Sequence, residues 1–380
     1  MIWTRRLAIL TTSAATVAAS VLGLAAPAHA AYTENPVTLA WHPTGAVHSS
    51  VSRDGVVYLG GKLDGIGGIA AVDATSGSLL WLLPANKDVR ALALSSDGSR
   101  LFAGGSFTAV NGQTRKHLVA VDVADHSVVT PWSGRAAGMV RDLVVSGDTV
   151  FVGGAFTSVD GVAGKGIGAV SATTGARITT FNHATDLDVM GLALTPDSLL
   201  MTGTFTKVDG QPRASIAAID LTTYALTSWA PRRFCDCATY WDVQTDGTNA
   251  YVGASGAGGN FAAFDLVTGE QPWPYVHADG DVQAVWLPGD GRVYLGGHFA
   301  VSIYSTATPQ VAVPVTVVAA VDLATGQPDP GFNPKIYKTY PGAWCLTSTA
   351  NRLWIGGDFT GELQNGTNNK QPYLAAYPGV

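Results

Sequence analysis

Two groups of aromatic and basic side chains in this 380-residue chain have the composition of a ligand-binding site. The groups are Arg232, Arg233, Tyr240 and Trp241, and Tyr337, Lys338, Tyr340 and Trp344. Aromatic rings offer flat apolar area and a guanidinium offers directed hydrogen-bond donors, so both groups suit a sugar or a peptide ligand. The simpler interpretation is that Trp241 and Trp344 fill the packing between layers of the fold.

The histidines form no pattern with metal-ligand spacing such as His-x-x-x-His. His298 is the one we add to the candidate binding residues, because it follows a Gly-Gly step where related segments carry a small residue. The Asn-Gly and Asp-Gly pairs, as at Asn111-Gly112 and Asp160-Gly161, are typical turn residues and do not supply the roughly six to eight converging oxygens of a calcium site. We therefore expect no metal and no cofactor.

No catalytic residue can be assigned from the sequence. The chain has no Gly-x-Ser-x-Gly elbow, and no order of Ser, His and Asp identifies a triad. An enzyme of this kind would need acid and base groups that converge from separate parts of the fold.

The first 30 residues have the features of a secretory signal peptide. Arg5 and Arg6 precede an apolar run of small residues, and Ala28-His29-Ala30 fits a small-x-small cleavage site. A retained membrane helix would need about 20 strongly apolar residues, and polar residues such as Ser20 interrupt this run. We expect the mature chain to be residues 31–380, secreted to the outside of the cell.

The charge of the mature chain argues against nucleic acid as a partner. Of the 22 basic residues two lie in the signal peptide, which leaves 20 against 28 acidic residues and a formal charge of −8. Nucleic-acid-binding proteins carry a basic footprint, and no run of Lys and Arg longer than a pair such as Arg232-Arg233 occurs. No segment after residue 30 is apolar for long enough to span a membrane.

The elements that must position the candidate residues come from an internal repeat. A short β-rich run ending in Gly-Gly recurs seven times, most clearly in 150–161. A period of roughly 40 to 50 residues with apolar runs and glycine turns is typical of a β-propeller, whose blades are four-stranded antiparallel sheets. The Gly-Gly step, or its degenerate form, falls at Gly60-Gly61, Gly104-Gly105, Gly153-Gly154, Thr202-Gly203, Gly253-Ala254, Gly296-Gly297 and Gly356-Gly357. A glycine pair at the end of a strand indicates a bulge or a close contact between neighbouring layers.

A run with an aromatic anchor accompanies each repeat, but only six copies follow a complete repeat. The seventh copy is Trp41, which precedes the first repeat. The run beginning at Val89, by similarity to WD-repeat propellers, is the innermost strand, and the aromatic run is the outermost. The sequence therefore predicts a seven-bladed β-propeller whose ring is closed by the N-terminal strand, with three strands of the last blade from the C-terminus and one from the N-terminus.

The phrase Gly-Gly-x-Phe-Thr-x-Val-(Asn/Asp)-Gly resembles a repeat of exported bacterial propellers of unassigned function. This resemblance implies fold and export and carries no catalytic residues. A weaker likeness to pyrroloquinoline quinone propellers lies in 70–81. Those enzymes, as the resemblance would imply, use an adjacent Cys-Cys pair and a bound metal, whereas Cys235 and Cys237 here are separated by one residue.

Three cysteines in an exported chain leave one unpaired if a disulfide forms. Cys235 with Cys237 is a local pair, and Cys237 with Cys345 would join two innermost strands near the channel mouth. We favour the local pair.

Binding residues concentrate on loops held by a rigid scaffold, and the longest insertions, 298–314 and 358–371, fall on one face of the predicted propeller. The sequence thus predicts a monomeric binding or scaffold protein that recognises a glycan or protein ligand through this loop-rich face. The alternative is a lyase or hydrolase that acts on a polysaccharide at the channel mouth.

Overall fold

The structure is a computed structural model that describes residues 32–235, 239–256, 259–307, 310, 312–334, 336–337, 342–364, 367–369 and 371–380. All regular secondary structure in these segments is β-strand, and every strand pairing is antiparallel. The predicted signal peptide lies outside the described residues.

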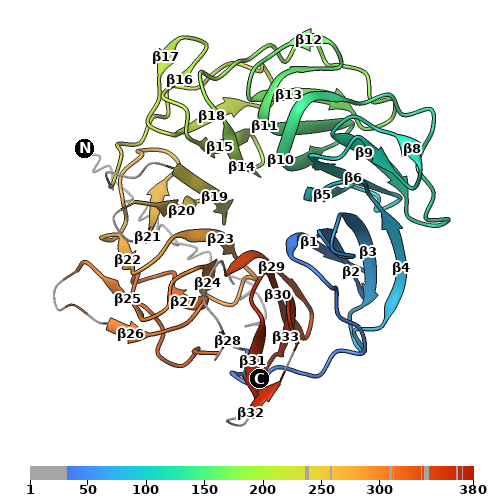
Figure 1. The fold of residues 1–380 in the computed structure, drawn as a ribbon. Helices are drawn as coiled ribbons and strands as arrows, with labels where there is room; N and C mark the ends of the chain where they lie inside the picture. The colour runs from blue at the N-terminus through green and yellow to red at the C-terminus, as the bar shows by residue number, and fades with distance from the viewer. Residues whose placement is uncertain are drawn as a thin grey trace, which may run out of the picture.

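The strands form sheets around a common centre (Figure 1), and in each sheet the chain runs from the innermost strand outward. The innermost strands are β1 (Val47–Arg53), β5 (Val89–Leu94), β10 (Ala136–Ser146), β14 (Val189–Leu194), β19 (Thr239–Thr245), β23 (Val282–Trp286) and β29 (Ala343–Thr349). The second strands are β2 (Val56–Gly61), β6 (Arg100–Gly105), β11 (Thr149–Val159), β15 (Ser198–Gly203), β20 (Asn249–Ser255), β24 (Arg292–Gly297) and β30 (Arg352–Gly357). The third strands are β3 (Gly68–Asp73), β9 (Leu118–Asp122), β13 (Ile167–Ser171), β18 (Ile216–Asp220), β21 (Gly259–Asp265), β27 (Val318–Asp322) and β33 (Leu374–Pro378). This is the β-propeller arrangement that the repeats predict.

The outermost strand is complete only where β4 (Leu79–Pro84) and β22 (Val276–Ala278) pair with their sheets. In four other sheets it is reduced to a single bridge, as between Val121 and Val128. The predicted aromatic anchors follow these bridges and pack against the next sheet. Trp132 donates its indole N–H to the carbonyl of Ser171 at 3.2 Å, and Trp229 does the same to Asp265 at 3.0 Å. In these sheets a buried tryptophan ring and one hydrogen bond from its indole N–H hold the outer segment in place of a long edge strand.

Short hairpins extend from the connections between second and third strands. They are built from β7 (Ala109–Val110) with β8 (Gln113–Thr114), β16 (Lys207–Val208) with β17 (Gln211–Pro212), β25 (Ser302–Ser305) with β26 (Ala312–Pro314), and β31 (Gly361–Gln364) with β32 (Thr367–Asn369). Two further strands add to this layer: β12 (Val162–Ala163) pairs with β11, and β28 (Ile336–Tyr337) pairs with β31. The bridges Ala85 to Val110 and Thr185 to Val208 join hairpins to the connections that lead into innermost strands, so both kinds of loop share one face.

The Gly-Gly step explains a bulge in every innermost strand. In the second sheet Val89 pairs with Gly105 and Ala91 pairs with Gly104, which leaves Arg90 outside the ladder. A Cβ on Gly105 would lie 2.2 Å from the carbonyl oxygen of Asp88, so glycine at this position lets the bulged backbone of this sheet approach closely. The sequence prediction of a bulge and a close contact is confirmed.

The first glycine of the step serves the contact between sheets. A Cβ on Gly104 would lie 2.3 Å from Cγ1 of Val140, the buried residue of β10 in the next sheet. The apolar core lies largely between successive sheets; one such cluster joins Phe102 and Leu118 to Val140 and Val152. Full burial of each such side chain contributes about 1.5–3 kcal/mol.

An Asp ends most of the third strands and caps the turn that follows. Asp73 accepts hydrogen bonds at Oδ1 from the backbone N–H groups of Thr75 and Ser76 and from the Ser76 hydroxyl, at 2.7–3.0 Å. These bonds hold the pKa of Asp73 below its usual value.

The N-terminal described segment runs beside β33. Thr33 donates its backbone N–H to the carbonyl of Pro378, and Val37 donates to that of Ala376, both at 2.8 Å, and Tyr32 bridges to Gly379. Trp41 then donates its backbone N–H to the carbonyl of Gly77 in the first sheet. The first described residues therefore hydrogen-bond to β33, near the C-terminal end of the described chain.

Candidate functional site

The bulges turn one side chain from each innermost strand into the central channel. These residues, which we call the bulge ring, are His48, Arg90, Arg141, Met190, Trp241, Gln283 and Trp344. They line a cavity of about 260 Å³, close to the lower limit of roughly 300 Å³ for small-molecule pockets. Arg141 lies in the middle of the longer β10, and the other six residues lie at the second or third position of their strands, so the ring faces the hairpin-bearing side of the propeller.

One side of the bulge ring is aromatic. The ring centroids of Trp241 and Trp344 lie 6.2 Å apart at 75°, and those of His48 and Trp344 lie 5.8 Å apart at 87°, both in edge-to-face geometry. The indole N–H groups of both tryptophans are buried and have no hydrogen-bond partner among the described residues. Two rings and two free donors are therefore presented together.

The other side of the bulge ring is charged. Asp88 accepts a hydrogen bond from Nδ1 of His48 at 2.7 Å and pairs with Nη2 of Arg90 at 2.8 Å. Burial opposes ionisation of Asp88, but the His48 hydrogen bond and the charges of His48 and Arg90 outweigh it, so the pKa of Asp88 lies below its usual value. Arg141 pairs with Asp188 at a longer 3.4 Å. Burial and the nearby Arg90 charge lower the pKa of Arg141 despite Asp188.

Two carboxyl groups lie directly beyond the ring, at Asp142 and Asp242. Each accepts two backbone hydrogen bonds: Asp142 from Leu143 at 2.8 Å and from Leu192 of the next sheet at 2.7 Å, and Asp242 from Val243 and Val285 at the same distances. Both residues are half-buried and line the channel cavity, while their carboxyl groups lie close among backbone atoms of neighbouring strands.

Enclosure raises the pKa of both carboxyls. Burial, together with the charge of Asp242, raises the pKa of Asp142 to about 8, and burial raises that of Asp242 to about 7. Gly191 lets β14 and β19 approach closely at this level, because a Cβ at position 191 would lie 2.9 Å from Cα of Asp242. The hydrogen bonds that Asp142 accepts from Leu192 and Asp242 accepts from Val285 join neighbouring sheets, so both carboxyls have a structural role.

Sequence reasoning missed most of this site. Of the predicted residues, only Trp241 and Trp344 belong to the bulge ring, while His48, Arg90, Arg141 and Gln283 were not singled out. The available signal was positional: each follows the buried residue that pairs with the second position of the Gly-Gly step, at a place where the side-chain type varies from repeat to repeat. The buried aspartates had a similar signal, since the other repeats carry a small residue there.

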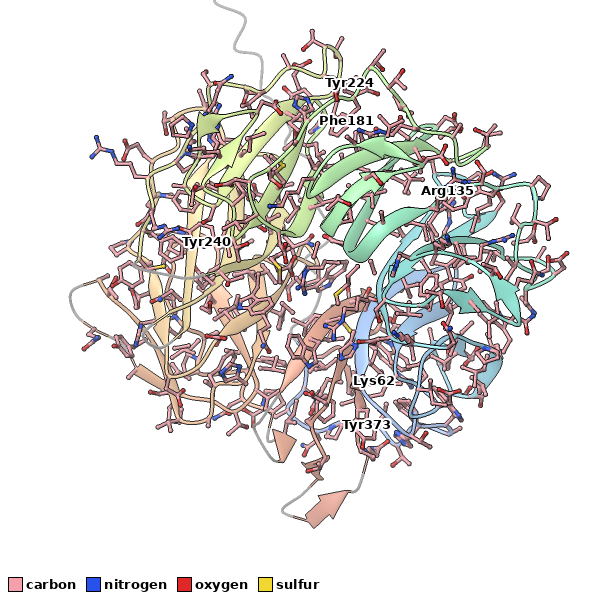
Figure 2. All side chains as sticks on the ribbon, turned by 45° about the horizontal axis from the view of Figure 1, so that its top comes forward. Lys62, Arg135, Phe181, Tyr224, Tyr240 and Tyr373 are labelled. Carbon is pink, nitrogen blue, oxygen red and sulfur yellow. The ribbon has the colours of Figure 1, made fainter. Side chains whose placement is uncertain are left out.

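The remaining predicted residues do not gather around the channel. Arg232 is exposed, and Arg233 donates to the hydroxyl of Ser215 at 3.1 Å. Tyr240, labelled in Figure 2, is fully buried between its own sheet and the preceding one. Its hydroxyl accepts a hydrogen bond from the Phe234 N–H, and burial raises its pKa to about 12. A side chain in this position cannot contact a ligand, so Tyr240 is corrected to a packing residue.

The structure describes only some of the four other predicted residues. His298 is half-buried beyond β24, with Nε2 4.0 Å from Oδ2 of Asp281. Tyr337 lies in β28, and its side chain falls outside the described part of the structure, as do Lys338 and Tyr340 altogether.

The cysteines follow the local-pair prediction as far as they are described. Cys235 is disulfide-bonded, and Cys345 is a free, buried thiol. A bridge from Cys237 to Cys345 is therefore excluded, while Cys237 itself lies outside the described residues. Cys345 borders the channel, and burial raises the pKa of its thiol to about 12.

Within the described segments, no group of three or more His, Cys, Asp or Glu side chains is placed to hold a metal ion. The same segments contain no helix of the length and apolarity needed to cross a bilayer.

Comparison with known proteins agrees with the propeller geometry. Residues 31–181 match a family model described as outer membrane protein assembly factor BamB. A crystal structure of RRP9 WD40 repeats superposes with a TM-score of 0.64 at 12% identity, covering 92% of this chain and 99% of that one. A structure of U3-55K gives a TM-score of 0.63 at 12% identity, covering 92% and 100%. No curated protein matches by sequence. These similarities show that the chain has a β-propeller fold, and at this identity the likeness shows fold alone.

Proposed function

We propose that this protein is a seven-bladed, closed propeller, exported from the cell, that binds a glycan at the mouth of its central channel. Closure is supported by the hydrogen bonds of Thr33 and Val37 to β33 and by packing between the last and first sheets. A Cβ on Gly356 of β30 would lie 2.6 Å from Cγ1 of Val47, the same type of contact that joins Gly104 to Val140. Export is supported by the signal-peptide pattern of residues 1–30.

The observation that carries the function is the bulge ring. A bulge re-aims a side chain, and here a repeated backbone device directs residues of different chemistry into one cavity. The bulge position faces the channel and not the core, so packing of the fold does not require Arg, Gln, His or Trp there. Propellers serve binding and scaffold roles generally, and a rigid ring that presents variable side chains suits such a role.

A glycan fits the chemistry of the ring better than an apolar ligand does. Trp241 and Trp344 offer faces and edges for the C–H surface of a sugar, and their indole N–H groups need acceptors that hydroxyl oxygens supply. Gln283 adds a buried amide oxygen without a partner in the described structure, which a sugar hydroxyl can donate to. The cavity volume of about 260 Å³ suits one terminal sugar and not a folded partner.

The test is a glycan array followed by calorimetry with the intact protein. Trp241→Ala and Trp344→Ala should each weaken binding of the best glycan at least tenfold, about 1.4 kcal/mol. Leu80→Ala, an exposed residue on the outer strand β4, is the matched control and should leave affinity unchanged. Binding that survives both tryptophan changes would refute a channel site.

A second candidate, a polysaccharide lyase or hydrolase at the same mouth, is favoured by the His48 and Asp88 pair. When His48 is neutral and donates from Nδ1 to Asp88, its Nε2 atom is a proton acceptor, as a general base requires. Release of product from any bound glycan, abolished by His48→Gln, would establish this candidate over simple binding.

A further inference from the structure

The bulge ring is divided into a basic side and an aromatic side. Arg90 and Arg141 come from β5 and β10, which lie across the centre from β19 and β23, the strands of Trp241 and Gln283 (Figure 1). Lys62, labelled in Figure 2, follows β2 and lies near enough to Asp88 to lower its pKa. The two sides therefore offer different chemistry to the two edges of one ligand.

The charges on the basic side do not cancel. Three cations, Lys62, Arg90 and Arg141, face two carboxylates, Asp88 and Asp188. The guanidinium side chains of Arg90 and Arg141 remain 29% and 25% exposed, and the Arg141 pair with Asp188 is long at 3.4 Å. Partly exposed pairs of this kind contribute little, so Arg141 can exchange its partner for a ligand at small cost.

Other charged groups near the channel do not supply a better partner for these cations. Asp142 and Asp242 point their oxygens to four backbone N–H groups, and Asp281 lies beside His298 in the sheet of β23. Arg90 and Arg141 are also close enough to repel each other. An anion between them would relieve this repulsion and accept directed hydrogen bonds from both.

We infer that the glycan bound at this mouth is acidic, with its anionic substituent held by Arg90 and Arg141 and its sugar ring held against Trp241 and Trp344. This inference rests on the proposed function and adds the class of ligand. A carboxylate and a sulfate share the chemistry that the arginines recognise, and the experiment separates them. Because the chain as a whole is acidic, the attraction of an anionic ligand comes from the nearby arginines alone. Salt screens charges that are partly exposed, so affinity for the acidic ligand should fall as the salt concentration rises.

The experiment measures calorimetric affinity of the full protein for three oligosaccharides of equal length: an oligogalacturonide, a sulfated oligosaccharide and a neutral cello-oligosaccharide. We expect one acidic probe to bind at least tenfold more tightly than the neutral one at 50 mM NaCl, with a smaller difference at 300 mM. The tighter acidic probe identifies carboxylate or sulfate as the recognised group.

Arg141→Gln should lower affinity for the acidic probe at least tenfold and change affinity for the neutral probe less than twofold. Arg135→Gln is the matched control, because Arg135 lies on the same face but is 54% exposed and pairs with Asp160 beside the hairpin layer. Unchanged thermal melting of both variants confirms that they fold.

The outcomes separate this inference from the proposed function. Equal binding of acidic and neutral probes, lost in Trp241→Ala but not in Arg141→Gln, would overturn the acidic class and keep glycan binding. Binding of a peptide through its terminal carboxylate, with no affinity for any glycan, would overturn both.

Discussion

The contact between Gly356 and Val47 decides whether the propeller ring is closed, and a double-mutant cycle can measure it. The two residues are 309 positions apart, in β30 of the last sheet and β1 of the first. A Cβ at position 356 would lie 2.6 Å from Cγ1 and 2.9 Å from Cβ of Val47. Separations below 3.0 Å force a shift, so Gly356→Ala should cost about 1–3 kcal/mol through overpacking.

Val47→Ala alone removes two buried methyl groups, at about 0.8 kcal/mol each, and leaves a small cavity, for a total of about 2 kcal/mol. In the double variant the new Cβ occupies the space left by the Val47 methyl groups. The loss of unfolding free energy should therefore be about 2–3 kcal/mol, below the sum of about 4 kcal/mol expected from the two single variants. The added Cβ would also lie 2.6 Å from Sγ of Cys345. This contact is present in both variants that carry Gly356→Ala, so its energetic cost cancels from the coupling energy.

The assay is urea unfolding followed by tryptophan fluorescence, with free energies extrapolated to water. Gly104→Ala with Val140→Ala is the matched cycle, because that contact, at 2.3 Å, joins consecutive sheets and does not depend on closure. Coupling of about 1–2 kcal/mol in both cycles is expected. Additivity within about 0.5 kcal/mol at 47 and 356, beside clear coupling at 104 and 140, would refute the closed ring.

Three further predictions concern stability and the buried thiol. Between about pH 4 and pH 8 the folded protein binds more protons at Asp142 and Asp242 than the unfolded chain does, so stability should fall as pH rises, by on the order of 1 kcal/mol per pH unit for each carboxyl. Urea midpoints that rise from pH 5 to pH 8 would contradict this sign, and Asp142→Asn should flatten the dependence. Deletion of residues 31–44 exposes the edge of β33 and removes the buried Leu39, so the melting temperature should drop by about 4 °C or more; an unchanged melt would exclude a structural role for this segment. Cys345 should resist iodoacetamide until the protein unfolds, because its thiol is buried with a raised pKa, and peptide mapping that finds it labelled in the native protein would contradict its placement.

The propeller class could be predicted from the sequence because its determinants are local and repeated. Each Gly-Gly step marks a second strand, and each Asp after an apolar run marks a tight turn whose hydrogen bonds stay within three residues, as Asp73 shows. The fourth strand was harder to predict. A tryptophan such as Trp132 anchors that segment through one bond to the next sheet, so a strand-like sequence forms a single bridge where the prediction expects a ladder.

The candidate site was harder still to predict, because its residues come together only when the separate sheets pack around the channel. Arg90 and Arg141 lie 51 positions apart in sequence, and each alone is an ordinary partly buried arginine beside an aspartate. Tyr240 shows the opposite error. It has the side chain of a binding residue and neighbours Trp241, but the bulge between Tyr240 and Asp242 turns Trp241 into the channel and leaves Tyr240 in the core.

The Gly-Gly step links construction of the fold to the site. One glycine lets the next sheet pack closely, and the other permits the bulge that turns Arg90 or its equivalent out of the ladder. The residue at the bulge is thereby released from the constraints of both the core and the strand pairing, which is why its type can vary while the strand remains intact. Ala254 occupies the second glycine position in the fifth sheet and keeps the same bulge at Trp241, so the register itself tolerates a methyl group there. Gly105→Ala should therefore preserve the propeller but displace Asp88 and Arg90, lowering affinity for the ligand more than it lowers the melting temperature; a large loss of stability with unchanged affinity would show that the glycine serves packing alone.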